Sequence, residues 1–172
     1  MKSSILSVLF IMGLSALSTA QEESFNDFKR EFNRRDGIHS ISVPGFLVRL
    51  AGSIAINENA ALDKEAVRPL IRNLGSVSII YTEDHMSLSQ NDILDFKSSL
   101  LNEGFEPLLE VRDNNDHVEI LSWGKKDIIK RLMIIINDDI SENLIINIRG
   151  HFTPQDVQKM VDKFQEENYR KI

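Results

Sequence analysis

The stretch that decides the fold is FEPLLEVRDNNDHVEILSWGKKDIIKRLMIIINDDISENLIINIRG, residues 105–150. It contains four runs rich in β-branched and other apolar residues, separated by clusters of turn-forming residues. The predicted strands are Phe105–Arg112, His117–Trp123, Ile128–Ile136 and Leu144–Arg149. Connections this short join neighbouring antiparallel strands, so the four runs predict a meander. Pro107 cannot donate a ladder hydrogen bond, which indicates that it lies near an edge of the sheet or near the start of its strand.

Within the third and fourth runs, the segments Leu132–Ile136 and Leu144–Ile148 are sustained apolar stretches rich in isoleucine. This pattern is typical of strands that are buried on both faces. If one face were exposed instead, it would be a surface for a partner.

Two helices flank the meander, and both carry the same start signal. Ser89 is followed three residues later by Asp92, and Thr153 is followed three residues later by Asp156. Within each pair, the side chain of either residue can accept a hydrogen bond from the backbone amide of the other. This reciprocal arrangement is the capping box at a helix N-terminus. The first helix is expected to end at Gly104, and the second to lie on the sheet through an apolar stripe.

A third helix is predicted near the start of the chain. Phe25, Phe28 and Phe32 fall on one helical face, and Gly37 marks the end of this segment. The stripe must be covered, and packing on the domain's own core is favoured over a partner because exposed aromatic stripes are uncommon.

The region between this helix and the meander alternates strands and helices. We expect a strand at Ile38–Val43, helices at 44–56 and 62–74, and a strand at Val77–Tyr81. Gly75 is predicted to end the second of these helices in the left-handed conformation.

Together these elements predict an α+β fold. The order from Val77 is β-α-β-β-β-β-α, an antiparallel meander sheet backed on one face by helices, preceded by the N-terminal helix, strand and helix pair. The expected organisation is a signal peptide over residues 1–20, an amphipathic helix over 21–37 and a single domain over 38–172.

The first residues have the pattern of a secretory signal. Lys2 precedes an apolar stretch from Ile5 to Leu17, and small residues lead to expected cleavage between Ala20 and Gln21. The apolar stretch is shorter than the roughly 20 residues of a membrane-spanning helix. We therefore expect a periplasmic or secreted protein with no membrane span after cleavage. The chain has no cysteine, so we expect neither disulfides nor a lipid anchor.

The charge of the chain narrows the class of partner. The formal net charge is −6 at pH 7. Nucleic-acid binding depends on clustered Lys and Arg, so a nucleic-acid partner is not expected.

No sequence pattern for a catalytic, cofactor or metal site is present, so none is predicted. The four histidines (His39, His85, His117 and His151) are scattered and are interpreted as ordinary surface or loop residues. The segment Asp113–Asp116 lacks the spacing of a calcium loop and predicts a hairpin turn. Trp123 is expected on the strand face shared with Glu119 and Leu121.

With the strands placed, the chain resembles the DUF4252 family of exported Bacteroidetes proteins of uncharacterised function. The resemblance is carried by VPGFLVRLAG (43–52), FEPLLEVRDNNDHVEI (105–120), IIKRLMIII (128–136) and LIINIRGHFTPQDV (144–157). It implies a cell-envelope location, and a link to extracytoplasmic sigma factors in some members suggests envelope signalling. Many relatives resemble lipoproteins with a cysteine at the signal end, where this chain has Ala20 and Gln21.

The leading hypothesis is a non-catalytic envelope protein that binds a protein or other ligand. One alternative is a signalling component linked to a sigma and anti-sigma system. Another is a hydrolase that uses strand carboxylates, for example Glu106, Glu110 and Glu119, since paired carboxylates can act as acid and base.

Overall fold

The computed structural model describes residues 23–58, 64–83, 88–113, 116–138 and 143–169. The strands are β1 (Ile38–Pro44), β2 (Leu74–Thr82), β3 (Glu106–Asp113), β4 (Asp116–Lys125), β5 (Ile128–Asp138) and β6 (Asn143–Phe152). The helices are α2 (Glu23–Phe32), α3 (Gly45–Glu58), α4 (Lys64–Asn73), α5 (Gln90–Asn102) and α6 (Pro154–Tyr169). The predicted α+β class is confirmed.

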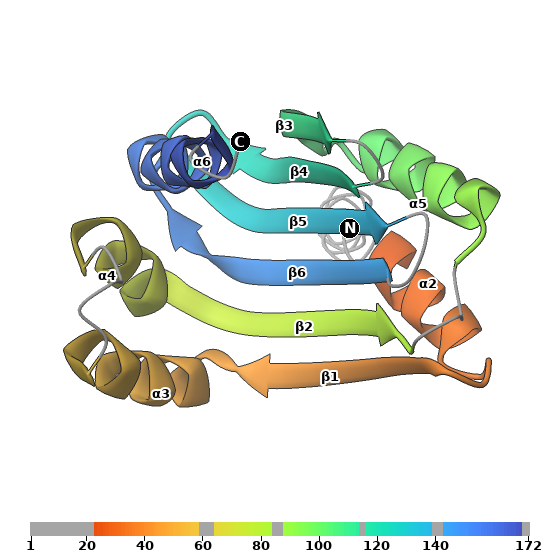
Figure 1. Ribbon diagram of the computed structural model, residues 1–172, viewed down its shortest axis with the longest axis horizontal. Helices are drawn as coiled ribbons and strands as arrows, with labels where there is room; N and C mark the ends of the chain where they lie inside the picture. The colour runs from red at the N-terminus through yellow and green to blue at the C-terminus, as the bar shows by residue number, and fades with distance from the viewer. Residues whose placement is uncertain (1–22, 59–63, 84–87, 114–115, 139–142, 170–172) are drawn as a thin grey trace, which may run out of the picture.

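The strands form one sheet in the order β1-β2-β6-β5-β4-β3, and all neighbours are antiparallel (Figure 1). The predicted meander from β3 to β6 is confirmed, and the β1–β2 pair continues the sheet beside β6. Pro107 lies in β3, which is an edge strand, as its missing donor indicated.

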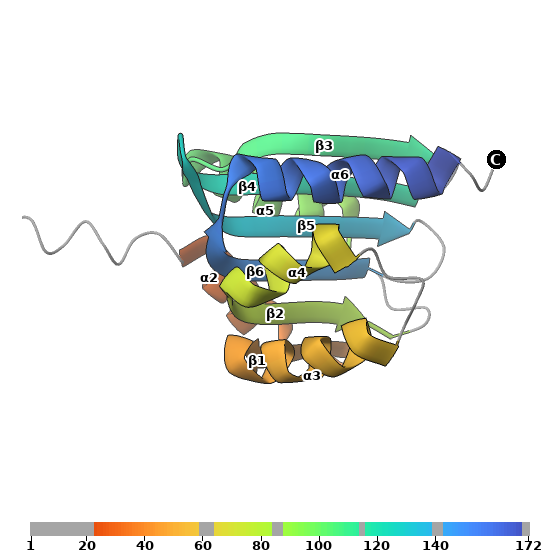
Figure 2. The ribbon, with the colours of Figure 1, turned by 90° about the vertical axis from the view of Figure 1, so that its left-hand side faces the viewer.

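Helices cover both faces of the sheet, whereas the sequence prediction placed them on one face (Figure 2). The helices α2 and α5 pack on one face, and α4 and α6 pack on the other. The physical reason lies in β5, where Met133 and Ile135 belong to one apolar cluster and Leu132 belongs to the second. A strand that is apolar on both faces needs a helical layer on each side.

The apolar cluster that contains Met133 and Ile135 also includes side chains of the N-terminal helix α2. Phe25, Phe28 and Phe32 are buried together with residues of α5 and of the sheet. The preference for packing on the domain's own core is therefore confirmed. Trp123 packs against the same cluster, on the face that it shares with Leu121, as its strand position indicated.

The predicted helix starts are also confirmed. The Ser89 side chain accepts from the Asp92 amide at 3.1 Å, and the Asp92 carboxylate accepts from the Ser89 amide at 3.0 Å. Thr153 and Asp156 make the same reciprocal pair at 3.1 and 3.3 Å. These contacts fix the residue at which each helix begins.

The prediction for Gly75 was wrong. Positive φ angles occur at Gly37 and Gly104, whereas Gly75 lies inside β2 at a register shift between β2 and β6. A Cβ atom at Gly75 would lie 3.3 Å from the Arg149 carbonyl oxygen. Close approach of two strands, and not a left-handed turn, accounts for the glycine.

Candidate functional site

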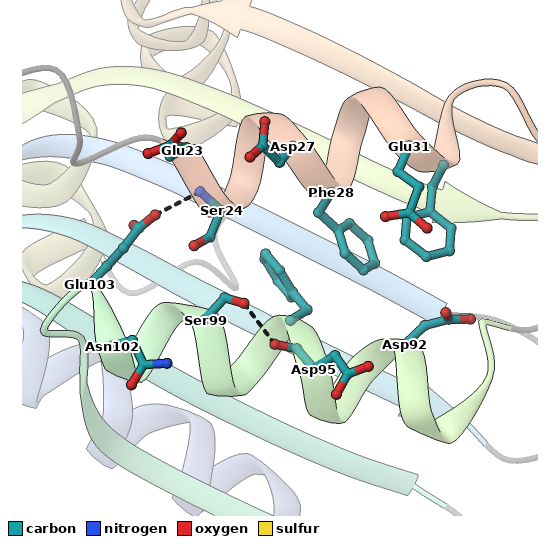
Figure 3. A pocket seen from close by; sticks show the side chains of 12 residues that line it. Glu23, Ser24, Asp27, Phe28, Glu31, Asp92, Asp95, Ser99, Asn102 and Glu103 are labelled. Carbon is teal, nitrogen blue, oxygen red and sulfur yellow. Dashed lines mark hydrogen bonds between the residues drawn. The ribbon is translucent and has the colours of Figure 1, made fainter.

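A groove of about 480 Å³ runs between α2 and α5 on one face of the sheet (Figure 3). Its lining residues come from these two helices and from the residue that follows α5. They are Glu23, Ser24, Asp27, Phe28, Glu31, Phe32, Asp92, Asp95, Phe96, Ser99, Asn102 and Glu103. Six of the twelve are carboxylates and none is basic, so the groove is strongly acidic.

Aromatic packing holds the two walls of the groove together. The Phe28 ring lies 4.2 Å from the Phe32 ring and 4.4 Å from the Phe96 ring, measured between centroids. All three side chains are buried, and Figure 3 shows Phe28 between the helices. The separation of α2 and α5 is therefore set by the apolar core beneath the groove.

Glu103 fixes one end of the groove. Its carboxylate accepts a hydrogen bond of 2.6 Å from the Ser24 amide in the first turn of α2. It also lies 3.7 Å from the guanidinium of Arg131, a buried residue of β5 that stacks on the Phe105 ring. A carboxylate at a helix N-terminus satisfies a free amide and favours the helix dipole.

The other carboxylates differ in how far they are neutralised. Asp27 pairs with Arg30 at 2.5 Å, and Arg35 lies 3.4 Å from Glu31 and 3.5 Å from Asp92. These contacts lie at the exposed rim of the groove, where water screens ion pairs strongly.

Glu23 and Asp95 form no ion pair with any residue that the structure describes. Negative charge therefore remains in excess along both walls. Within the described part of the chain, no three His, Asp or Glu side chains are grouped so that they could hold a metal ion. The arrangement suits a cationic group that is spread over several carboxylates.

The three strand carboxylates of the hydrolase hypothesis lie apart from this groove. Glu110 and Glu119 are directly opposed on β3 and β4, whereas Glu106 is opposed to Ser122. The Glu119 carboxylate is buried and lies 2.5 Å from the Lys97 ammonium group of α5.

Glu110 is held by different partners. Its carboxylate lies 2.8 Å from the Arg112 guanidinium and 3.1 Å from the His117 ring. The hydrogen bonds from Arg112 and then from His117 hold the pKa of Glu110 below its usual value. The two opposed carboxylates thus stand in two separate ion pairs.

The structure does not bring the described histidines together. His39 lies on β1 and bonds Glu83 at 2.7 Å, whereas His117 lies on β4, with β2, β6 and β5 between them. His151 is exposed near the end of β6, and His85 lies outside the described residues. The expected cleavage site at Ala20 and Gln21 also lies outside the described residues.

The segment between β3 and β4 is the predicted hairpin. Asp113 and Asp116 are the last paired positions of the two strands. The structure does not describe the two residues between them.

The groove was missed by the sequence analysis because its two walls are distant in the chain. The bond between Ser24 and Glu103 joins residues that are 79 positions apart. The only local signal is acidic spacing: Glu23, Asp27 and Glu31 recur every four residues and therefore share a helical face.

The described fold and groove define a class of protein: an α+β domain whose single antiparallel sheet lies between two helical layers, with an acidic groove between two helices of one layer. None of the helices in the described residues is long and apolar enough to span a bilayer.

The model of a family described as "Domain of unknown function (DUF4252)" matches residues 28–160. The chain belongs to this family, as its strand and turn segments indicated. No curated protein and no solved structure matches the chain.

Proposed function

We propose that this protein is an exported, non-catalytic component of the cell envelope that binds a cationic segment of a partner protein in the groove between α2 and α5. The observation that carries the proposal is the composition of the groove, which has six carboxylates and no basic side chain among its lining residues. The signal-like N-terminus, with cleavage between Ala20 and Gln21, supports the envelope location.

The electrostatics of the groove favour a flexible basic segment over a single small ion. The carboxylates are distributed along two helices and are partly engaged at the rim, so no single point collects them all. A segment with several Lys or Arg side chains can reach successive carboxylates, and each contact adds a modest interaction in an open, solvated site. Charge complementarity of this kind also steers association.

Affinity for a fluorescein-labelled octalysine peptide tests the proposal. Fluorescence anisotropy with the full chain should show binding that weakens as salt increases. The double variant Asp27→Asn/Asp95→Asn removes one carboxylate from each wall and should weaken binding roughly tenfold at low salt.

The double variant Glu106→Gln/Asp162→Asn is the matched control, because it changes the net charge equally at exposed positions outside the groove. It should leave the affinity within about twofold of the unaltered chain. Equal losses in both double variants would mean that the peptide responds to net charge and not to the groove, and the proposal would fail.

A further inference from the structure

In the part of the chain that the structure describes, β1 is an edge strand of the sheet. β1 pairs with β2 on one side, and no strand among the described residues pairs with it on the other. Figures 1 and 2 both show β1 and α3 together at the lower border of the molecule. An edge strand presents unpaired amide and carbonyl groups, which are a template for a further strand.

The two edges of the sheet are built differently. β3 carries Pro107 within the strand, a register shift beside it, and the charged side chains Glu106, Glu110 and Arg112. These are the usual devices that prevent pairing at an edge. β1 has an unbroken register with β2 from Ile38 to Pro44, with its only proline at the last position and no Lys, Arg, Asp or Glu.

Apolar side chains lie exposed on β1 and at the start of α3. Ile41 is 49% exposed, Phe46 is 61% exposed and Leu47 is 44% exposed. Since α3 packs against β2 and α4, these side chains of α3 lie away from those elements. We name the surface made of β1, Phe46 and Leu47 the β1–α3 edge.

The distribution of acidic residues indicates which partner could bind at this edge. The chain carries 26 Asp and Glu residues, yet none of them lies within residues 37–57. Two copies of an acidic protein repel each other over most of their surfaces. β1 itself brings no carboxylate to this edge, and the Glu83 carboxylate beside it is bonded to His39 at 2.7 Å, whereas a strongly basic partner would prefer the acidic groove.

The area at this edge is sufficient for a reversible dimer. The three apolar side chains expose roughly 300 Å² in each copy, and two paired strands would bring the total buried area to about 1,000 Å². This area lies at the lower limit for specific interfaces, which is typical of weak, reversible association.

We propose that β1 of one copy pairs antiparallel with β1 of a second copy, so that two sheets join into one twelve-stranded sheet. The twofold axis passes near Ile41, the middle residue of the strand, and Phe46 and Leu47 of each copy pack against the partner. The acidic groove lies between α2 and α5 and stays open, so a dimer presents two grooves.

Sedimentation velocity of the full chain from about 1 to about 200 µM tests this proposal. We expect a concentration-dependent dimer. Ile41→Lys and Phe46→Lys should each weaken association at least about tenfold. Leu108→Lys is the matched control, because Leu108 lies on β3 and is 41% exposed, and it should leave association unchanged.

A chain that remains monomeric over this range would overturn the proposal, as would a dimer that survives both variants or that is lost in the Leu108 control. Hydrogen exchange provides a readout that needs no variant. The β1 amides should exchange more slowly at high than at low concentration, and exchange that does not depend on concentration would also refute the proposed pairing.

Discussion

Replacing Phe28 with Ala removes the ring that joins α2 to α5 beneath the acidic groove. Phe28 is 6% exposed, and its ring lies 4.2 Å from Phe32 and 4.4 Å from Phe96 between centroids. Truncating a buried Phe costs about 3–5 kcal/mol, from lost burial and the remaining cavity. Ala is the better helix former by about 0.5 kcal/mol, so we expect a net loss of about 2.5–4.5 kcal/mol in the free energy of unfolding.

Urea denaturation followed by circular dichroism measures this loss. With a denaturant slope of about 2 kcal/mol per molar, the unfolding midpoint should fall by about 1.2–2.3 M urea. Leu94→Ala is the control, because Leu94 is on α5 but 55% exposed, and it should change stability by less than about 1 kcal/mol. If Phe28→Ala destabilised the chain no more than this control, α2 would not be part of the core and the groove would lack a fixed wall.

Three further changes test other parts of the structure. Gly45→Ala places a Cβ atom 2.5 Å from a backbone oxygen at the start of β2, so calorimetry should show a melting temperature about 4–8 °C lower. Lys97→Met leaves the buried Glu119 carboxylate without its partner, and urea denaturation should show a loss of about 2 kcal/mol, part of which Glu119→Gln in the same chain restores. Arg112→Ala should raise the pKa of Glu110 toward its usual value, as measured by carboxyl-carbon NMR.

The lowered pKa of Glu110 determines how the contribution of this residue to stability changes with pH. Because the folded state lowers the pKa of Glu110, the ionised carboxylate stabilises the fold above its ordinary pKa, and this contribution is lost as the pH falls through the lowered pKa. Both partners are substantially exposed, so the effect on stability is small and the NMR titration is the decisive readout. A Glu110 pKa that is unchanged in Arg112→Ala would refute the assignment.

Local features of the fold could be predicted because they depend on neighbouring residues. The capping box at Ser89 involves residues three positions apart, and the hairpin at Asp113–Asp116 joins adjacent strands. The isoleucine-rich run in β5 already indicated burial on both faces, and the prediction of helices on one face conflicted with it. The structure resolves the conflict by placing α6 and α4 opposite α2 and α5.

The pairing of β2 with β6 and the groove itself could not be predicted in the same way. The order of strands that are distant in the chain depends on which apolar faces pack together. The hydrophobic periodicity of the sequence identifies each strand but not its neighbours in the sheet. Gly75 is an example of a residue whose role depends on a contact with a distant part of the chain. A glycine at the end of a helical pattern indicates a left-handed cap, but here the need for space beside Arg149 decides the position.

Under the proposed function, the carboxylates between α2 and α5 form the binding surface for a cationic segment. Amide chemical-shift mapping of the ¹⁵N-labelled chain during titration with octalysine tests it most directly. We expect the largest shifts at residues that line the groove, from both helices and at the same peptide concentration. Shifts confined to the β3–β4 region, or no saturable shifts at low salt, would contradict the claim.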